Sequence, residues 1–207
     1  MKGLFELPDG YAEIRRIDLK KDKKFTILLN VAALVLFAVM LVLGLLISPL
    51  CIPIVLTKSM NAILVFALLI VAIVAYIICH ELVHGLFFRV FTGKKAKYGF
   101  NGIFAYAYSD AYVSKVPYVI IGLAPVIVFG IIFLVLNIVL PQEWFWFVYL
   151  LQIMNISGAV GDFYITYLVC KSPTDLLAHD EVPAMIFYSR EKYEQQPDTD
   201  QSVHTNS

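Results

Sequence analysis

The chain has 207 residues, of which 60% are hydrophobic and 15% are charged, and its mean hydropathy of +0.78 excludes an ordinary soluble domain. Sixteen basic and sixteen acidic residues give a formal net charge of zero, which argues against nucleic acid as a partner. The lipid bilayer is the first partner to expect, and the composition predicts an integral, multi-pass membrane protein.

The predicted membrane spans are four apolar runs, each longer than the ~20 residues that a spanning helix needs. The fold class that we predict is therefore an all-α membrane protein with four transmembrane helices in one domain, residues 25–171. A polar segment precedes this domain at residues 1–24, and another follows at 172–207, with a small strand pair before about residue 190 and disorder after it. The four runs cover residues 25–55, 61–91, 116–140 and 144–170.

The basic residues predict the orientation of these spans. Seven of them precede the first span, Lys58 is alone between the first and second, five lie at positions 89–115, and none lies between the third and fourth. Basic residues accumulate in cytoplasmic loops, so both termini are expected in the cytoplasm.

The second span contains the sequence His80-Glu81-Leu82-Val83-His84. On a helix, residues four apart lie on one face, so both imidazoles can bind one zinc ion while Glu81 reaches a water molecule there as general base. Each ionisable group in lipid costs roughly 2.5 kcal/mol or more, so three of them in five residues predict a functional site. A polar cluster that neighbouring helices satisfy without any metal is the structural alternative.

Between the second and third spans, aromatic residues alternate around Asn101-Gly102. Alternation with an Asn-Gly turn predicts a β-hairpin at about residues 97–108, on the cytoplasmic side. One edge of this hairpin could bind an extended substrate, or its rings could form an interfacial belt that only anchors the protein. The aromatic positions are 98, 100, 104, 106, 108 and 112.

A catalytic zinc site needs a third protein ligand, and the best candidate is Asp162. It is the only acidic residue besides Glu81 inside a predicted span. From the cytoplasmic ends of their spans, Asp162 lies ~12 Å deep and the two histidines ~10 to 16 Å, so the depths match. Asn155, seven residues before Asp162 in the same span, could hydrogen-bond a substrate carbonyl or backbone near the metal. If Asp162 only packs helices, the substitute ligands would be His179, Asp110 or Glu181.

With His80-Glu-Leu-Val-His84 in one span and Asn155 to Asp162 in a later one, the chain resembles the site-2 protease type of intramembrane zinc metalloprotease. From Leu7-Pro-Asp-Gly-Tyr11 through Leu123-Ala-Pro125 to Gly161-Asp162, it is similar to a bacterial family of small membrane proteins described as putative zincin peptidases. The resemblance implies a bacterial plasma membrane, His80, His84 and Asp162 as zinc ligands, Glu81 as general base and Asn155 as the family asparagine. Here Ile156 follows Asn155 and Phe163 follows Asp162, where site-2 proteases have Asn-Pro and Asp-Gly.

The function that we expect is zinc-dependent hydrolysis of peptide bonds in membrane proteins or peptides, within or beside the bilayer. The alternative from another class is a non-catalytic, zinc-containing adaptor or chaperone that holds a membrane partner. A metal transporter is disfavoured, because no second cluster of acids or histidines offers an ion a path across the membrane.

Overall fold

The structure is a computed structural model that describes residues 4–18, 22–48, 62–100, 105–182 and 184–190. Three expectations lie wholly or partly outside these residues: the end of the first span, the Asn101-Gly102 turn and the disorder after about residue 190.

Long apolar helices dominate the structure. Three are long and apolar enough to cross a membrane, which indicates a membrane protein. A fourth span exists if the bent pair of α5 (Phe145–Gly158) and α6 (Val160–Lys171) is counted as one. A short 3₁₀ turn, η1 (Gln142–Trp144), precedes this pair. The three long helices are α1 (Lys23–Ile47), α3 (Ala62–Thr92) and α4 (Lys115–Val139).

The predicted fourth span is not one continuous helix. It breaks at Ala159, whose φ of −86° and ψ of 14° are not helical, and the two halves meet at an angle of 40°. Gly158 and Gly161 flank the break, and glycine is the poorest helix former after proline. The break matters for the site, because it places Asp162 in the first turn of a new helix.

A four-stranded antiparallel sheet corrects the expectation of an all-α fold. Its order is β1-β6-β5-β4, so the first strand of the chain pairs with the last. The expected strand pair after the fourth span is present as β5 and β6, whereas β1 and β4 were not predicted. The strands are β1 (Ala12–Asp18), β4 (Val113–Ser114), β5 (Leu177–Glu181) and β6 (Ala184–Ser189).

The predicted hairpin is confirmed as a separate two-stranded sheet. Strand β2 (Lys97–Phe100) pairs antiparallel with β3 (Ala105–Tyr108), and Tyr98 lies opposite Ala107. The hairpin packs on α3, where the absence of a side chain at Gly85 lets the Tyr98 ring lie against the helix. The close approach fixes the hairpin beside the His-Glu-x-x-His turn.

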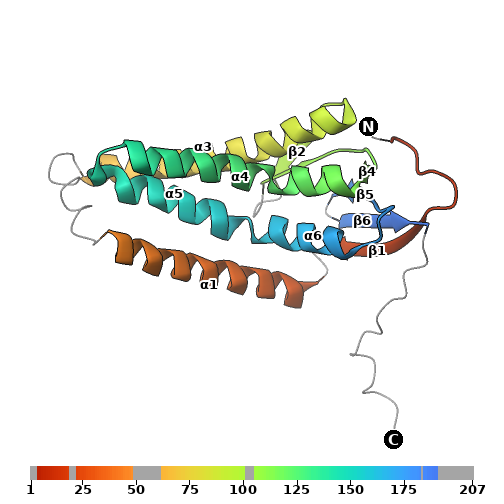
Figure 1. Ribbon diagram of the computed structural model, residues 1–207, viewed down its shortest axis with the longest axis horizontal. Coiled ribbons are helices and arrows are strands. Elements are labelled where there is room, and N and C mark those ends of the chain that lie inside the picture. The colour runs from red at the N-terminus through yellow and green to blue at the C-terminus, as the bar shows by residue number, and fades with distance from the viewer. Residues whose placement is uncertain (1–3, 19–21, 49–61, 101–104, 183, 191–207) are drawn as a thin grey trace, which may run out of the picture.

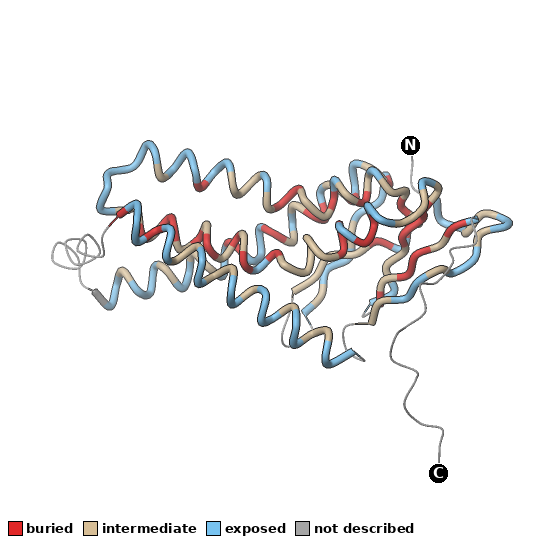
Figure 2. Tube along the Cα trace, turned by 60° about the horizontal axis from the view of Figure 1, so that its bottom comes forward, coloured by how far each residue is buried: buried red, intermediate tan, exposed pale blue. Residues whose placement is uncertain are grey.

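The helices lie side by side along the long axis, and the four-stranded sheet covers one end of the bundle (Figure 1). At that end α1 and α4 begin and α3 and α6 end, so α3 runs in the same direction as the α5–α6 pair. Buried residues follow the inner faces of the helices and continue into the sheet (Figure 2). The largest core cluster joins α3, α4 and α6 to the sheet, and includes Phe88, Ile121, Leu168 and Phe187.

Candidate metal centre

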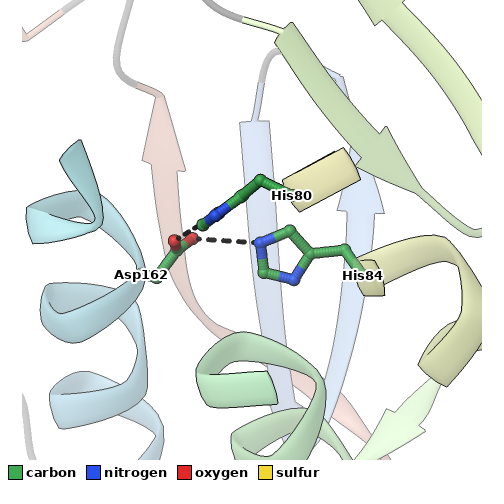
Figure 3. A group of neighbouring side chains, drawn as sticks. All are labelled: His80, His84 and Asp162. Atoms are coloured by element: carbon green, nitrogen blue, oxygen red, sulfur yellow. Dashed lines mark hydrogen bonds and ion pairs between the residues drawn. The ribbon is translucent and has the colours of Figure 1, made fainter. Parts of the chain in front are cut away.

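Three of the predicted site residues meet between two helices. His80 and His84 project from α3, and Asp162 projects toward them from the first turn of α6 (Figure 3). The Nε2 atom of His80 lies 3.3 Å from Oδ2 of Asp162, and Nε2 of His84 lies 3.6 Å from Oδ1. Both histidines are only 8% exposed. The three side chains form a possible metal site, with all three ligand atoms within 4.8 Å of one another.

These separations fit a tetrahedral zinc site. Zinc lies ~2.0 to 2.2 Å from histidine nitrogen and carboxylate oxygen, so two ligand atoms at tetrahedral corners are ~3.3 to 3.6 Å apart. The two nitrogen–oxygen distances of 3.3 and 3.6 Å are of that length, and each runs to a different oxygen of the Asp162 carboxylate. Two imidazoles and one carboxylate are also a donor set that catalytic zinc sites use, with the fourth position left open.

A backbone carbonyl on α4 orients the His84 ring. Nδ1 of His84 lies 2.9 Å from the carbonyl oxygen of Ile121, and since a carbonyl only accepts, the nitrogen must donate. The Nδ1 atom therefore carries a proton. In the neutral ring the lone pair is then on Nε2, which faces Asp162.

Two side chains orient the His80 ring in a similar way. The amide nitrogen of Asn155 donates to the carbonyl of Val126 at 3.0 Å, which turns the amide oxygen toward Tyr76. The Tyr76 hydroxyl donates its single proton to that oxygen at 3.1 Å. It can then only accept from Nδ1 of His80, 3.1 Å away. His80 also carries its proton on Nδ1 and presents Nε2 to Asp162.

The protons on the two Nδ1 atoms decide what the centre can bind. With both Nδ1 atoms used as donors, three electron-rich atoms converge: Nε2 of His80, Nε2 of His84 and a carboxylate oxygen of Asp162. Such atoms repel one another unless a metal ion or a proton lies among them, and a proton on Nε2 would make the hydrogen bond between His80 and Asp162. Buried lone pairs of this kind suit a divalent metal.

Glu81 lies next to the centre on α3 and is partly buried. Strand β3 packs on α3 with the backbone of Ala107 near the Glu81 carboxyl group, so the hairpin borders the site on this side. Glu81 is not a member of the metal-binding group. A free carboxylate beside three metal ligands is available for proton transfer.

The alternative third ligands lie elsewhere and have other partners. His179 stacks on Tyr112 with ring centroids 4.4 Å apart. Asp110 pairs with Lys97 at 2.6 Å, and Glu181 pairs with Arg16 at 3.2 Å. Among the described residues, none of these three joins the group of possible metal ligands.

Asn155 lies near the centre, but its side chain is fully buried. Both its polar atoms bond within the protein, to Tyr76 and to Val126. Tyr76 itself was missed from the sequence, although it lies one helical turn before His80. A tyrosine at that spacing within an apolar span was the available signal.

Comparison with known proteins supports the chemistry of this centre. The model of the family described as "Putative zincin peptidase" matches residues 73–177, just over half of the chain and all of the centre. No curated protein and no solved structure gave a match. The chain therefore belongs to the family described as "Putative zincin peptidase".

Proposed function

We propose that this protein is a zinc-dependent endopeptidase that hydrolyses peptide bonds of membrane proteins, within or beside a bacterial plasma membrane. The observation that supports this proposal is the convergence of His80, His84 and Asp162 from two helices, with Glu81 beside them. These residues fit the ligand set and general base of a zinc hydrolase.

Zinc bound at the centre would polarise a substrate carbonyl and acidify a water molecule. Glu81 is placed to accept the proton of that water and to return it to the leaving amine. Asp162 and the two buried histidines hold their positions through the helices that carry them, so little reorganisation is needed during the reaction.

The hairpin supports a mode of substrate binding. Strand β3 packs on α3 with the backbone of Ala107 near Glu81, and it pairs with β2. An extended segment lying along β3 would bring its peptide bonds next to the general base. Peptidases need such an extended substrate, because a helical peptide bond is shielded by its own hydrogen bonds.

The test separates metal binding from catalysis. Detergent-purified wild type is expected to hold about one zinc per chain and to cleave membrane-spanning peptides in liposomes. His84→Ala and Asp162→Asn should lose the zinc. Glu81→Gln should keep the zinc and lose cleavage by at least about a hundredfold, which is the usual contribution of a general base. Glu143→Gln, at an exposed position in η1, should change neither.

Absence of zinc from folded wild type reloaded with metal would overturn the proposal. Cleavage by Glu81→Gln at the wild-type rate would also contradict it. If Glu81→Gln lacks cleavage yet fully complements a deletion strain, the cellular role does not depend on hydrolysis. The adaptor function would then replace the peptidase.

A further inference from the structure

Helix α4 contributes no metal ligand, yet both histidines are anchored to one stretch of it. His84 bonds to the carbonyl of Ile121, and His80 reaches the carbonyl of Val126 through Tyr76 and Asn155. Both accepting carbonyls lie within six residues of the same helix.

Pro125 explains the anchor of His84. In an α-helix the carbonyl of residue i accepts from the N–H of residue i+4, which for Ile121 is residue 125. Pro125 lies inside α4 and has no N–H, so the Ile121 carbonyl has no helical donor. Both residues are buried, where an unpaired carbonyl would cost free energy. The Nδ1 proton of His84 takes the place of the missing N–H at 2.9 Å.

Tyr76 and Asn155 anchor His80 by another route. Tyr76 is 8% exposed and Asn155 is fully buried, so water does not compete for their polar atoms. The donor at the start of this chain of bonds is the Asn155 amide, which has two protons and uses one on Val126. The order of donors and acceptors then has one solution, in which His80 donates from Nδ1.

We propose that Tyr76, Asn155 and Pro125 are positioning residues that keep a proton on Nδ1 of both histidines and so direct both Nε2 atoms at Asp162. This inference rests on the proposed function in one respect: the fixed ring orientation helps the protein only if the centre binds zinc. A ring held in this way offers zinc a lone pair without reorganisation. Helix α4 acts as a template for the metal centre. In this proposal Asn155 positions the His80 ring through Tyr76 and does not bind substrate.

The first experiment measures zinc affinity by competition with a chelator, in detergent. Tyr76→Phe keeps the ring but removes the hydroxyl that accepts from Nδ1 of His80, and it should raise the zinc dissociation constant about tenfold to a hundredfold. Its matched control is Tyr149→Phe, which removes a tyrosine hydroxyl that donates to the Met40 carbonyl on α1, a helix that carries no metal ligand. The control should leave zinc affinity within about twofold of wild type.

The proline is tested in the same assay. Pro125→Ala restores an N–H that competes with His84 for the Ile121 carbonyl, so zinc affinity should fall by about tenfold. Pro117→Ala is the matched control, because Pro117 lies in the first turn of α4, where an N–H has no helical partner. Folded Tyr76→Phe and Pro125→Ala proteins that both bind zinc as tightly as wild type would overturn the inference.

A second readout does not depend on zinc or on activity. Long-range ¹⁵N–¹H spectra of histidine-labelled protein at pH 8, free of metal, report which ring nitrogen carries a proton. We expect protonated Nδ1 in both His80 and His84, with loss of that state for His80 in Tyr76→Phe. A proton on Nε2 alone in either ring of wild type would overturn the inference. If wild type binds no zinc, the peptidase proposal fails while this spectrum still decides the positioning role.

Discussion

At the scale of the residue, Asp180 on β5 makes stability depend on pH. Burial raises the pKa of Asp180 to about 6 from 3.8, although the Tyr118 hydroxyl donates to its carboxylate at 2.7 Å. The folded protein therefore binds this proton more tightly than the unfolded chain does. The resulting contribution to the free energy of unfolding is fully present below pH 4. That stability is lost as pH rises to 6, by roughly 3 kcal/mol at ~1.4 kcal/mol per pH unit. Unfolding of wild type and Asp180→Asn in detergent between pH 4 and 7 measures it.

Asp175 supplies a control of opposite sign. Although burial acts to raise it, the pKa of Asp175 is lowered by hydrogen bonds from the Ser189 hydroxyl and the Arg190 N–H. Its contribution to stability is present above pH 4 and is lost as the pH falls further. Asp175→Asn should therefore reduce stability at pH 7, whereas Asp180→Asn should flatten the loss between pH 4 and 6. An unchanged pH profile in Asp180→Asn would contradict the assignment.

At the scale of the element, α1 docks on α5 through one glycine. Gly44 is the only buried residue of α1 among those described, and a Cβ there would overlap the ring of Tyr149. The ring cannot move freely, because the Tyr149 hydroxyl donates to the Met40 carbonyl at 2.7 Å. Gly44→Ala should therefore lower the free energy of unfolding by about 1 to 3 kcal/mol. Thermal unfolding in detergent measures the loss.

The zinc affinity of Gly44→Ala should stay at the wild-type value, because α1 carries no ligand. Gly158→Ala is the control for the substitution itself, since a Cβ there meets no atom within 4 Å. It should not destabilise the protein, because alanine is the better helix former. A larger loss of stability in Gly158→Ala than in Gly44→Ala would contradict this view of the α1–α5 contact.

At the scale of the whole molecule, the two ends of the bundle should face opposite sides of the membrane. The sheet end carries the basic segments, whereas no lysine or arginine lies between residues 116 and 170. The positive-inside rule therefore predicts that the sheet lies in the cytoplasm. With the native cysteines replaced, thiol reagents that cannot cross the membrane should label Asp9→Cys and Lys94→Cys only from inside, and Glu143→Cys only from outside. Labelling of all three from one side would contradict this topology.

Most of the centre could be predicted from the sequence, because its signals are local or depend on depth. The spacing of His80 and His84 follows from the helical repeat, and Asp162 was found because two parallel spans place residues at comparable depths. The hairpin was predictable from alternation at positions 98 to 108. Strand β1 was not, because it pairs with β6, about 170 residues later, and no local pattern identifies such a partner.

The sequence by itself determined the membrane class, three of the helical spans, the hairpin and the residues that meet at the centre, since apolar length and side-chain spacing are properties of short segments. Only the tertiary structure decided where the protons lie. The free carbonyl that Pro125 leaves at Ile121, and the bond from Tyr76 to Asn155, become useful to His84 and His80 only when α3, α4 and α5 pack together. Hydrogen bonds between helices depend on the relative rotation and depth of each helix, and packing of the whole bundle sets both.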